Sequence, residues 1–578
     1  MTSAPFPDAP GADPAEPGDL GQAGVPSPEP RRGGFGRAAL LLSAGTFVSR
    51  ALGFVNVAIL SATIGTETAA SNTFTIANTL PNGVYAIVAG GLLSAILVPR
   101  IVRARLDADG GEKFISRVIT LGVVLFAIIT LIATLCGPLL VRLYGSQSTG
   151  GSGRGLSAAD IGLATAFAYW CLPQIFFYAL YSLLGEVLNA RNIYGPFSWA
   201  PAVNNVVAIA GLIIFNVLFG TVFQHPGLQD SAHWTPWMIA VLAGTATLGI
   251  VGQGMFLLLF WRRVGIRFRP DFHWRGVGLG SVGKAAGWTF AMILITQLAG
   301  IVQSSVASEA GSHNPSNTVL QRAWLIMMLP HGLITLPIMT PYFTRMSGHA
   351  HRGDLDAMRH DFGESLRTVG LFVCLAGTGL IVMAFPFAKV FSPNFVETQA
   401  MAYVIIAYLI GLIPSAILFI IQRTFYAFED TRTPFIFQTF QSVLFVSGAL
   451  VVSGLGRPQI GIGIALLTTV ACYIQTILAA ILLRRRMGSL GGFAVLRAYL
   501  VYLLALIPAS AAGIGVNLAL GSFHAGGFAV SGVAEAVVAL IAIGAAMAIV
   551  YVGALAALRS PELRDVAGVF TRRFRRAS

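Results

Sequence analysis

The most constraining feature of this sequence is a series of long apolar runs, each able to cross a lipid bilayer. A spanning helix needs about 20 mainly apolar residues, and 55% of the 578 residues are apolar. Only 11% are charged, against roughly 25% in an ordinary soluble domain. The sequence therefore predicts an all-α integral membrane protein with about 14 transmembrane helices, near residues 38–64, 78–101, 117–143, 159–189, 199–222, 237–261, 281–307, 317–343, 366–392, 397–426, 433–454, 459–483, 496–520 and 529–557.

The short segments between these runs differ in charge in a regular way. Arginines precede the first run and follow every even-numbered run, whereas the intervening loops 65–71 and 224–236 contain no Lys or Arg. By the positive-inside rule, this alternation predicts that both termini are cytoplasmic. Residues 1–37 are rich in Pro, Gly and Ala and predict a disordered N-terminal tail. Residues 558–578 predict a basic C-terminal tail.

Composition excludes several classes of function. The net charge of +13 could suggest nucleic acid, but the arginines lie in short clusters that orient a membrane protein. The four cysteines lie singly in apolar runs, without the spacing of a disulfide framework or a metal site. No phosphate-binding loop or metal-ligand array is evident, so we expect a transporter without cofactor or metal rather than an enzyme.

Two parts of the chain look alike. Leu80-Pro81-Asn82-Gly83 resembles Leu329-Pro330-His331-Gly332, and LNARNIYGP after run 4 resembles FYAFEDTRTP after run 10. Six helices repeated in one orientation is an arrangement of secondary transporters whose site lies between the halves. We therefore expect an N-lobe at 38–261, a C-lobe at 281–483 and two added helices at 496–557.

Arg50 is the most informative polar residue, because it lies about midway along the first run. An arginine at that depth costs roughly 2.5 to 3.5 kcal/mol and is too deep to reach the membrane surface easily. A planar guanidinium binds phosphate or carboxylate through two parallel hydrogen bonds. Arg50 is thus a candidate receptor for an anionic substrate; the alternative is a structural arginine bonded to carbonyl, Ser or Asn groups of neighbouring helices.

Other polar residues are weaker candidates for the substrate site. Amides inside spans more often cap helices or bond neighbouring helices than bind ligands. Arg322 lies in the first turn of run 8, where its side chain could reach the surface. A lone histidine such as His331, after a proline deep in a span, is more often held by hydrogen-bonded packing than used as a proton carrier. The candidate substrate-binding residues are Arg50, Asn56, Asn72, Asn82, Arg322 and His331.

Four segments resemble the MurJ (MviN) lipid II flippases of the MOP exporter superfamily: SRALGF at 49–54, LPNGVYAIVAGGLLSAILVP at 80–99, LNARNIYGPFSWAPAVNN at 188–205 and FYAFEDTRTP at 425–434. The resemblance implies 14 helices in two lobes around a cationic cavity, with a groove between the last two helices for a polyprenyl tail. It also implies movement of lipid II, the undecaprenyl-pyrophosphate-linked peptidoglycan precursor, to the outer leaflet of the bacterial cytoplasmic membrane by alternating access. Arg50 matches the family's cavity arginine, and membrane lipids and cell-wall synthesis proteins are the further partners implied.

The sequence departs from the family pattern at several charged positions. Asn56 stands where many members have a second arginine, Asn72 where an acid is expected, and Leu325 where an arginine is usual. Tyr85 and Ala86 replace an arginine pair, and Gly90 replaces a glutamate. We therefore expect a less charged cavity. The excess of Arg over Lys is typical of a GC-rich bacterium such as an actinobacterium.

Two alternatives to lipid II flipping stay open. Related exporters of the superfamily move drug-like cations or other polyprenyl-linked saccharides, and a cation exporter generally needs a carboxylate deep in the bundle, where this chain has Arg50. A membrane scaffold for cell-wall synthesis, without transport, is the other alternative.

Overall fold

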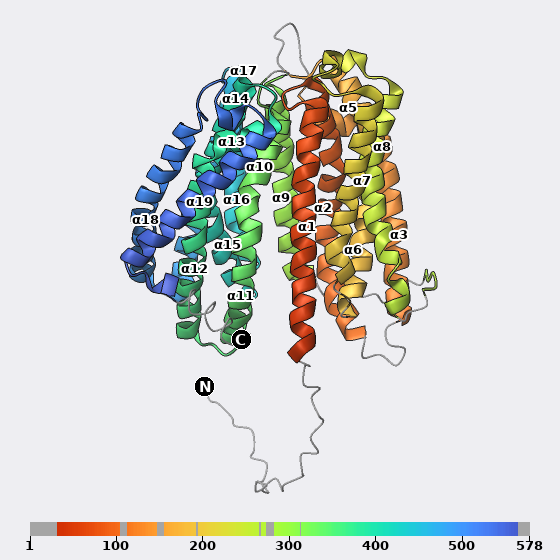
Figure 1. The fold of residues 1–578 in the computed structure, drawn as a ribbon. Coiled ribbons are helices and arrows are strands. Elements are labelled where there is room, and N and C mark those ends of the chain that lie inside the picture. The colour runs from red at the N-terminus through yellow and green to blue at the C-terminus, as the bar shows by residue number, and fades with distance from the viewer. Residues whose placement is uncertain are drawn as a thin grey trace, which may run out of the picture.

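The computed structural model describes residues 32–104, 112–146, 155–191, 193, 195–264, 268–272, 283–311 and 314–564, with the backbone alone at 32–43, 89–104, 189–190 and 283–286. Most of the expected N-terminal tail and the end of the C-terminal tail lie outside these residues. The described chain is almost entirely helical (Figure 1).

The long helices follow the apolar runs closely. Their bounds are α1 Arg32–Ile64, α2 Ala69–Ala104, α3 Glu112–Leu135, α4 Gly137–Tyr144, α5 Ala158–Cys171, α6 Gln174–Ala190, α7 Gly195–Phe219, α8 Pro236–Leu258, α9 Gly283–Ser308, α10 Asn317–Pro330, α11 Leu336–His351, α12 Leu355–Val382, α13 Ala384–Phe391, α14 Phe395–Leu409, α15 Leu412–Ala427, α16 Arg432–Val452, α17 Arg457–Met487, α18 Gly492–Ala519 and α19 Val533–Ala557. Short 3₁₀-helices lie at Pro226–Gln229, Ser231–His233, Trp261–Val264 and Phe528–Val530, and a π-helix, η4, at His331–Thr335.

Thirteen segments of the described chain are long and apolar enough to cross a membrane. They correspond to all the expected spans except 78–101. That span lies within α2, where side chains beyond residue 88 are outside the described set. The prediction of an all-helical, multi-pass membrane protein is confirmed.

Prolines break four of the spans. The helix is interrupted at or just before Pro173, Pro337, Pro386 and Pro414. Proline has no N–H to donate to the carbonyl four residues earlier, and its ring clashes with that carbonyl. A further break lies between α3 and α4, next to Pro138.

The order of helices repeats along the chain. In the first part a long helix, α3, is followed by the eight-residue α4 and the broken pair α5–α6; in the second, α12 is followed by the eight-residue α13 and the broken pair α14–α15. The pairs begin alike, because Ser157 caps α5 and Asn394 caps α14 through side-chain hydrogen bonds. This agrees with the internal repeat seen in the sequence.

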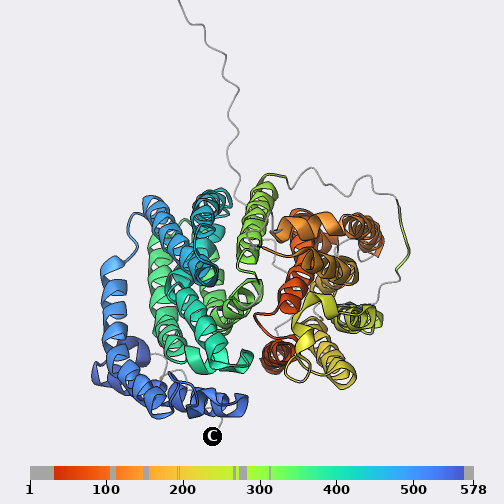
Figure 2. The ribbon, with the colours of Figure 1, turned by 90° about the horizontal axis from the view of Figure 1, so that it is seen from above.

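Two groups of helices, each with its own apolar core, make up the molecule (Figure 2). The core of the first group, α1–α8, extends from Ile64 to Val264. Most of the second core belongs to α9–α17, and α18 and α19 pack on α12 and α13 at its edge. The groups meet where α1 and α2 contact α9, α10 and α13. The exact lobe boundaries stay a prediction.

Candidate functional site

Arg50 lies on the face of α1 that meets the second helix group. Its side chain is half-buried. No hydrogen bond or ion pair joins it to any other residue that the structure describes. Its guanidinium rests on the backbone of Gly332, where an added Cβ atom would overlap it. The expected alternative, an arginine bonded to neighbouring carbonyl or amide groups, is therefore not what the structure has.

The surface under Arg50 is the π-helix η4, which interrupts span 8 just before Pro337. The His331 ring lies edge-on to Phe419, with 4.8 Å between ring centroids. Its buried Nδ1 and the buried Oγ1 of Thr335 have no hydrogen-bond partner among the described residues. Such π-bulges occur frequently at functional sites. His331 is thus packed against Phe419, and its Nδ1 has no hydrogen bond from the residues that the structure describes.

Neighbouring residues hold α1 in place around Arg50. The Asn205 side chain of α7 donates a hydrogen bond to the carbonyl of Ser49, with 2.9 Å between the atoms. Phe54, one turn further along α1, packs edge-on to Phe391 of α13 at 5.2 Å between ring centroids. Asn56 is half-buried and has no hydrogen-bond partner among the described side chains and backbone. Contacts with both groups therefore set the depth and rotation of Arg50.

Arg322 lies at one end of the interface between the two groups, beside the turn between α1 and α2. We call this end the upper end, after its place in Figure 1. It is only 3% exposed, and its Nη1 donates to the carbonyl of Gly65 at 3.3 Å. Nearby, Thr66 donates to Glu397 of α14 at 2.9 Å. The expectation that Arg322 extends to the membrane surface is wrong, because the α1–α2 turn covers it.

Asn72 lies beside this contact in a cluster of uncharged polar groups that joins α2 to α10. Its Oδ1 accepts from the backbone N–H of Thr318 at 3.3 Å. Ser71 and Thr75 each approach the Thr318 hydroxyl, at 3.0 and 2.9 Å. Ser316, the N-cap residue of α10, makes no side-chain capping bond. Asn72 therefore supplies the cap from the other helix group, as the structural alternative for these amides anticipated.

Asn82 lines a cavity of about 530 Å³ between the two groups. Its walls come from α2, α4, α9, α10, α14, α15, α16 and α17, and none of the described residues that line it is charged. Arg50 is not among these residues, so the structure does not bring the candidates into one pocket. The walls carry six glutamines: Gln297, Gln303, Gln321, Gln438, Gln441 and Gln475.

The sequence singled out none of these glutamines as a candidate residue. Amides bond to one another along the wall: Gln475 donates to Gln438 at 3.0 Å, and Gln438 donates to Gln441 at 2.9 Å. The signal that could have found them is the spacing of Gln438, Gln441 and Ser442 on one face of a predicted helix. The lining of this cavity is uncharged and combines these amides with apolar side chains.

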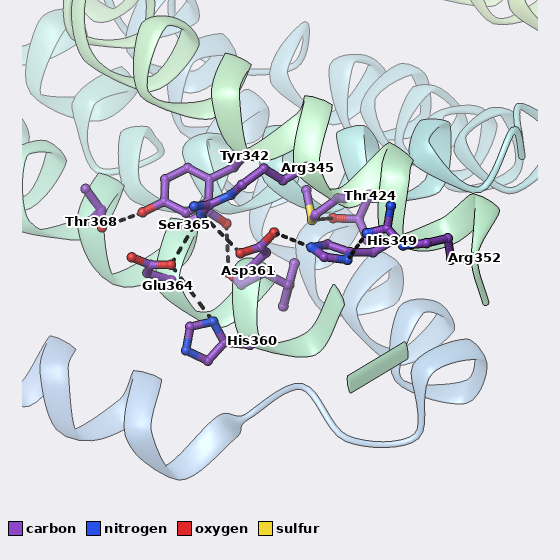
Figure 3. A network of polar contacts seen from close by, with 12 residues as sticks. Tyr342, Arg345, His349, Arg352, His360, Asp361, Glu364, Ser365, Thr368 and Thr424 are labelled. Atoms are coloured by element: carbon purple, nitrogen blue, oxygen red, sulfur yellow. Dashed lines mark hydrogen bonds and ion pairs between the residues drawn. The ribbon is translucent and has the colours of Figure 1, made fainter. Parts of the chain in front are cut away.

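A charged network at the opposite, lower end joins α11 to α12 (Figure 3). Arg345 contacts Asp361 at 3.1 Å and Glu364 at 3.4 Å, and His349 lies 3.4 Å from the other Asp361 oxygen. His360, Asp361 and Glu364 are close enough to share a metal ion. However, Arg345 already pairs with both carboxylates. We therefore interpret this network as a connection within the second group.

Comparison with known proteins supplies the family. The model of the family described as "Lipid II flippase MurJ" matches residues 60–539. The chain belongs to the MurJ lipid II flippase family. This is a family of transporters and not of enzymes.

Individual relatives are distant. A probable lipid II flippase MurJ of Vibrio cholerae is 26% identical over 416 residues, 69% of this chain and 74% of that protein. One from Haemophilus influenzae is 25% identical over 67% of this chain and 75% of its own length. A solved lipid II flippase MurJ in an inward closed conformation has the same fold, with a TM-score of 0.68 and 20% identity, over 91% of this chain and 100% of that one. An inward-facing MATE multidrug transporter has a TM-score of 0.59 at 17% identity, over 78% of this chain and 99% of its own.

Proposed function

We propose that this MurJ-family protein flips lipid II from the inner to the outer leaflet of the bacterial cytoplasmic membrane by alternating access, and that Arg50 binds the pyrophosphate. The observation that carries the proposal is the unpaired guanidinium of Arg50 in mid-span, held on Gly332. A cation at mid-span without an acidic partner is costly, and a ligand that brings its own negative charge reduces that cost. A pyrophosphate also offers oxygens in the geometry that a guanidinium fits.

The uncharged cavity suits the rest of such a substrate. Amide and hydroxyl groups can donate to and accept from sugar hydroxyls and peptide bonds, and the lining holds six glutamines beside Asn82. In this proposal Arg50 binds the charged part of the head group, and the cavity binds its neutral part. The polyprenyl tail lies along α18 and α19, as the family resemblance implies.

The upper end faces the outside in this proposal. The arginine clusters of the sequence support that orientation, because they fall at the opposite end of the spans. The turn between α1 and α2 is a poor place for a label, because Thr66 in that turn is only 1% exposed. Cysteines placed at the exposed Gln224 and at Ser578, in a chain lacking its native cysteines, should react with an impermeant reagent from opposite sides. Reaction of both from outside would contradict the orientation.

The decisive test is replacement of Arg50 in cells depleted of their own lipid II flippase. Arg50→Ala should insert normally but fail to restore growth, and lipid II should accumulate. Arg50→Lys should rescue partly, because an ammonium retains charge without the two-pronged geometry. Arg142→Ala, which removes an exposed arginine of α4, is the matched control and should complement fully. Full complementation by well-expressed Arg50→Ala would refute the receptor role.

The same experiment separates the alternative functions. A cation exporter related to MATE proteins needs a carboxylate to exchange ions, and the lining of the uncharged cavity contains none. A scaffold without transport should retain its function in Arg50→Ala, and lipid II should not accumulate in that variant beyond the wild-type level.

A further inference from the structure

We propose that Glu67 and Glu397 form a proton-binding site at the upper end of the interface, occupied when the two helix groups are in contact there. The role of this contact in transport rests on the proposed alternating-access cycle. The proton-binding site itself does not. Glu67 belongs to the turn between α1 and α2, and Glu397 to the first turn of α14. The hydroxyl of Thr66, the residue before Glu67, donates a hydrogen bond to Glu397, so the two carboxyl groups approach each other from opposite groups.

Their surroundings differ in a way that decides where the proton resides. Both oxygens of Glu397 accept hydrogen bonds at 2.9 Å, one from Asn394 and one from Thr66. Glu67 is only 6% exposed, and its buried Oε1 has no hydrogen-bond partner among the described residues. A charged carboxylate is costly to bury without partners. Glu67 is thus the carboxyl group of the pair that takes up the proton.

The charged groups around this pair are two cations of the second group. Arg322 of α10 and Lys389 of α13 both act on Glu397. Lys389 also donates to the carbonyl of Pro393 at 2.9 Å. For Glu67 the neighbouring charge that matters is the negative one of Glu397. Burial, and then this carboxylate, raise the pKa of Glu67 from 4.5 to about 8.

The sign of the pH dependence follows from linkage. When the groups separate at the upper end, Glu67 becomes hydrated and its pKa returns toward 4.5. Between pH 4.5 and about 8, the contacting state holds a proton that the separated state has released. Rising pH therefore weakens the contact across this window, and the effect levels off above about 8. Deprotonation places two carboxylates opposite each other across the interface, which favours separation.

The test measures the contact itself and not transport. Spin labels at Gln224 in the first group and Val396 in the second would report the upper-end distance by pulsed electron spin resonance. The protein would be full-length, free of native cysteines and reconstituted in lipid nanodiscs. In the wild type, the separated fraction should rise between pH 5 and 8 and then level off. Glu67→Gln, which mimics the protonated form, should stay in contact at every pH.

Two further variants keep the result interpretable. Glu535→Gln alters a carboxyl group in the first turn of α19, which packs on α18, α12 and α13 of the second group, and should retain the wild-type pH response. Glu397→Gln removes the repelling charge and should shift the response to lower pH, which remains measurable if Glu67→Gln fails to fold. A wild type without pH dependence, or an unchanged response in Glu67→Gln, would overturn the proposal. Because transport is not measured, these outcomes are independent of the test of Arg50.

Discussion

Arg50 and Arg322 both lie where the two helix groups meet, yet their surroundings are opposite. Arg322 is almost completely buried, bonds the Gly65 carbonyl and lies under the negative charge of Glu397. Arg50 is half-buried and has only the backbone of Gly332 beneath its guanidinium. An arginine whose partners belong to the protein holds the two groups together, whereas one without partners is available to a ligand. The comparison assigns a structural role to Arg322 and leaves the anionic substrate to Arg50.

The largest effect that would sharpen this comparison is expected at Arg322. Arg322→Ala removes a charged hydrogen bond and one of the two described cations that act on Glu397, which should lower the free energy of unfolding by about 2 kcal/mol. Thermal unfolding of the purified protein measures this, and Arg50→Ala should leave the same quantity nearly unchanged. Arg322→Lys retains the charge and should lose less. Equal destabilisation by Arg50→Ala and Arg322→Ala would remove the distinction between the two arginines.

A smaller effect is expected at Gly332, which supports Arg50. In Gly332→Ala, the new Cβ atom must displace the guanidinium, so transport should fall on the order of tenfold, equivalent to about 1.4 kcal/mol. Stability should not fall, because alanine is the better helix former. A Cβ atom at Gly287 of α9 would meet no atom within 4 Å, so Gly287→Ala is the matched control. Transport is measured as clearance of lipid II after depletion of the host flippase, and a fully active Gly332→Ala would show that the position of Arg50 is unimportant.

The contrast between the two arginines also marks the limit of sequence reasoning. The spans were predictable because the length of an apolar run depends on local sequence alone. The breaks near Pro173 and Pro414 are also local, because they follow from the missing N–H of proline. The partners of a side chain, in contrast, depend on the folded structure. Arg322 is buried beside Gly65 and Glu397, which lie far from it in sequence. Its position in the first turn of a span suggested that Arg322 reaches the surface. The local sequence does not show that the turn between α1 and α2 covers it. The glutamine-lined cavity escaped prediction for the same reason, because its walls come from both groups.

The smallest of these effects is expected at Asn72, which lies beside Arg322 but contributes no charge. Asn72→Ala leaves the buried N–H of Thr318 without its acceptor, and loss of such a cap typically costs about 1 kcal/mol. Asn72→Asp retains an acceptor at the N-terminus of α10, where a negative charge is favourable, and should preserve the contact better. The spin-label distance between Gln224 and Val396 reports both variants at a pH near 6, where Glu67 is protonated in the contacting state. If Asn72→Asp separated the groups as readily as Asn72→Ala, the cap from α2 to α10 would not stabilise the upper end, and the contact would depend on Arg322 and Glu397 alone.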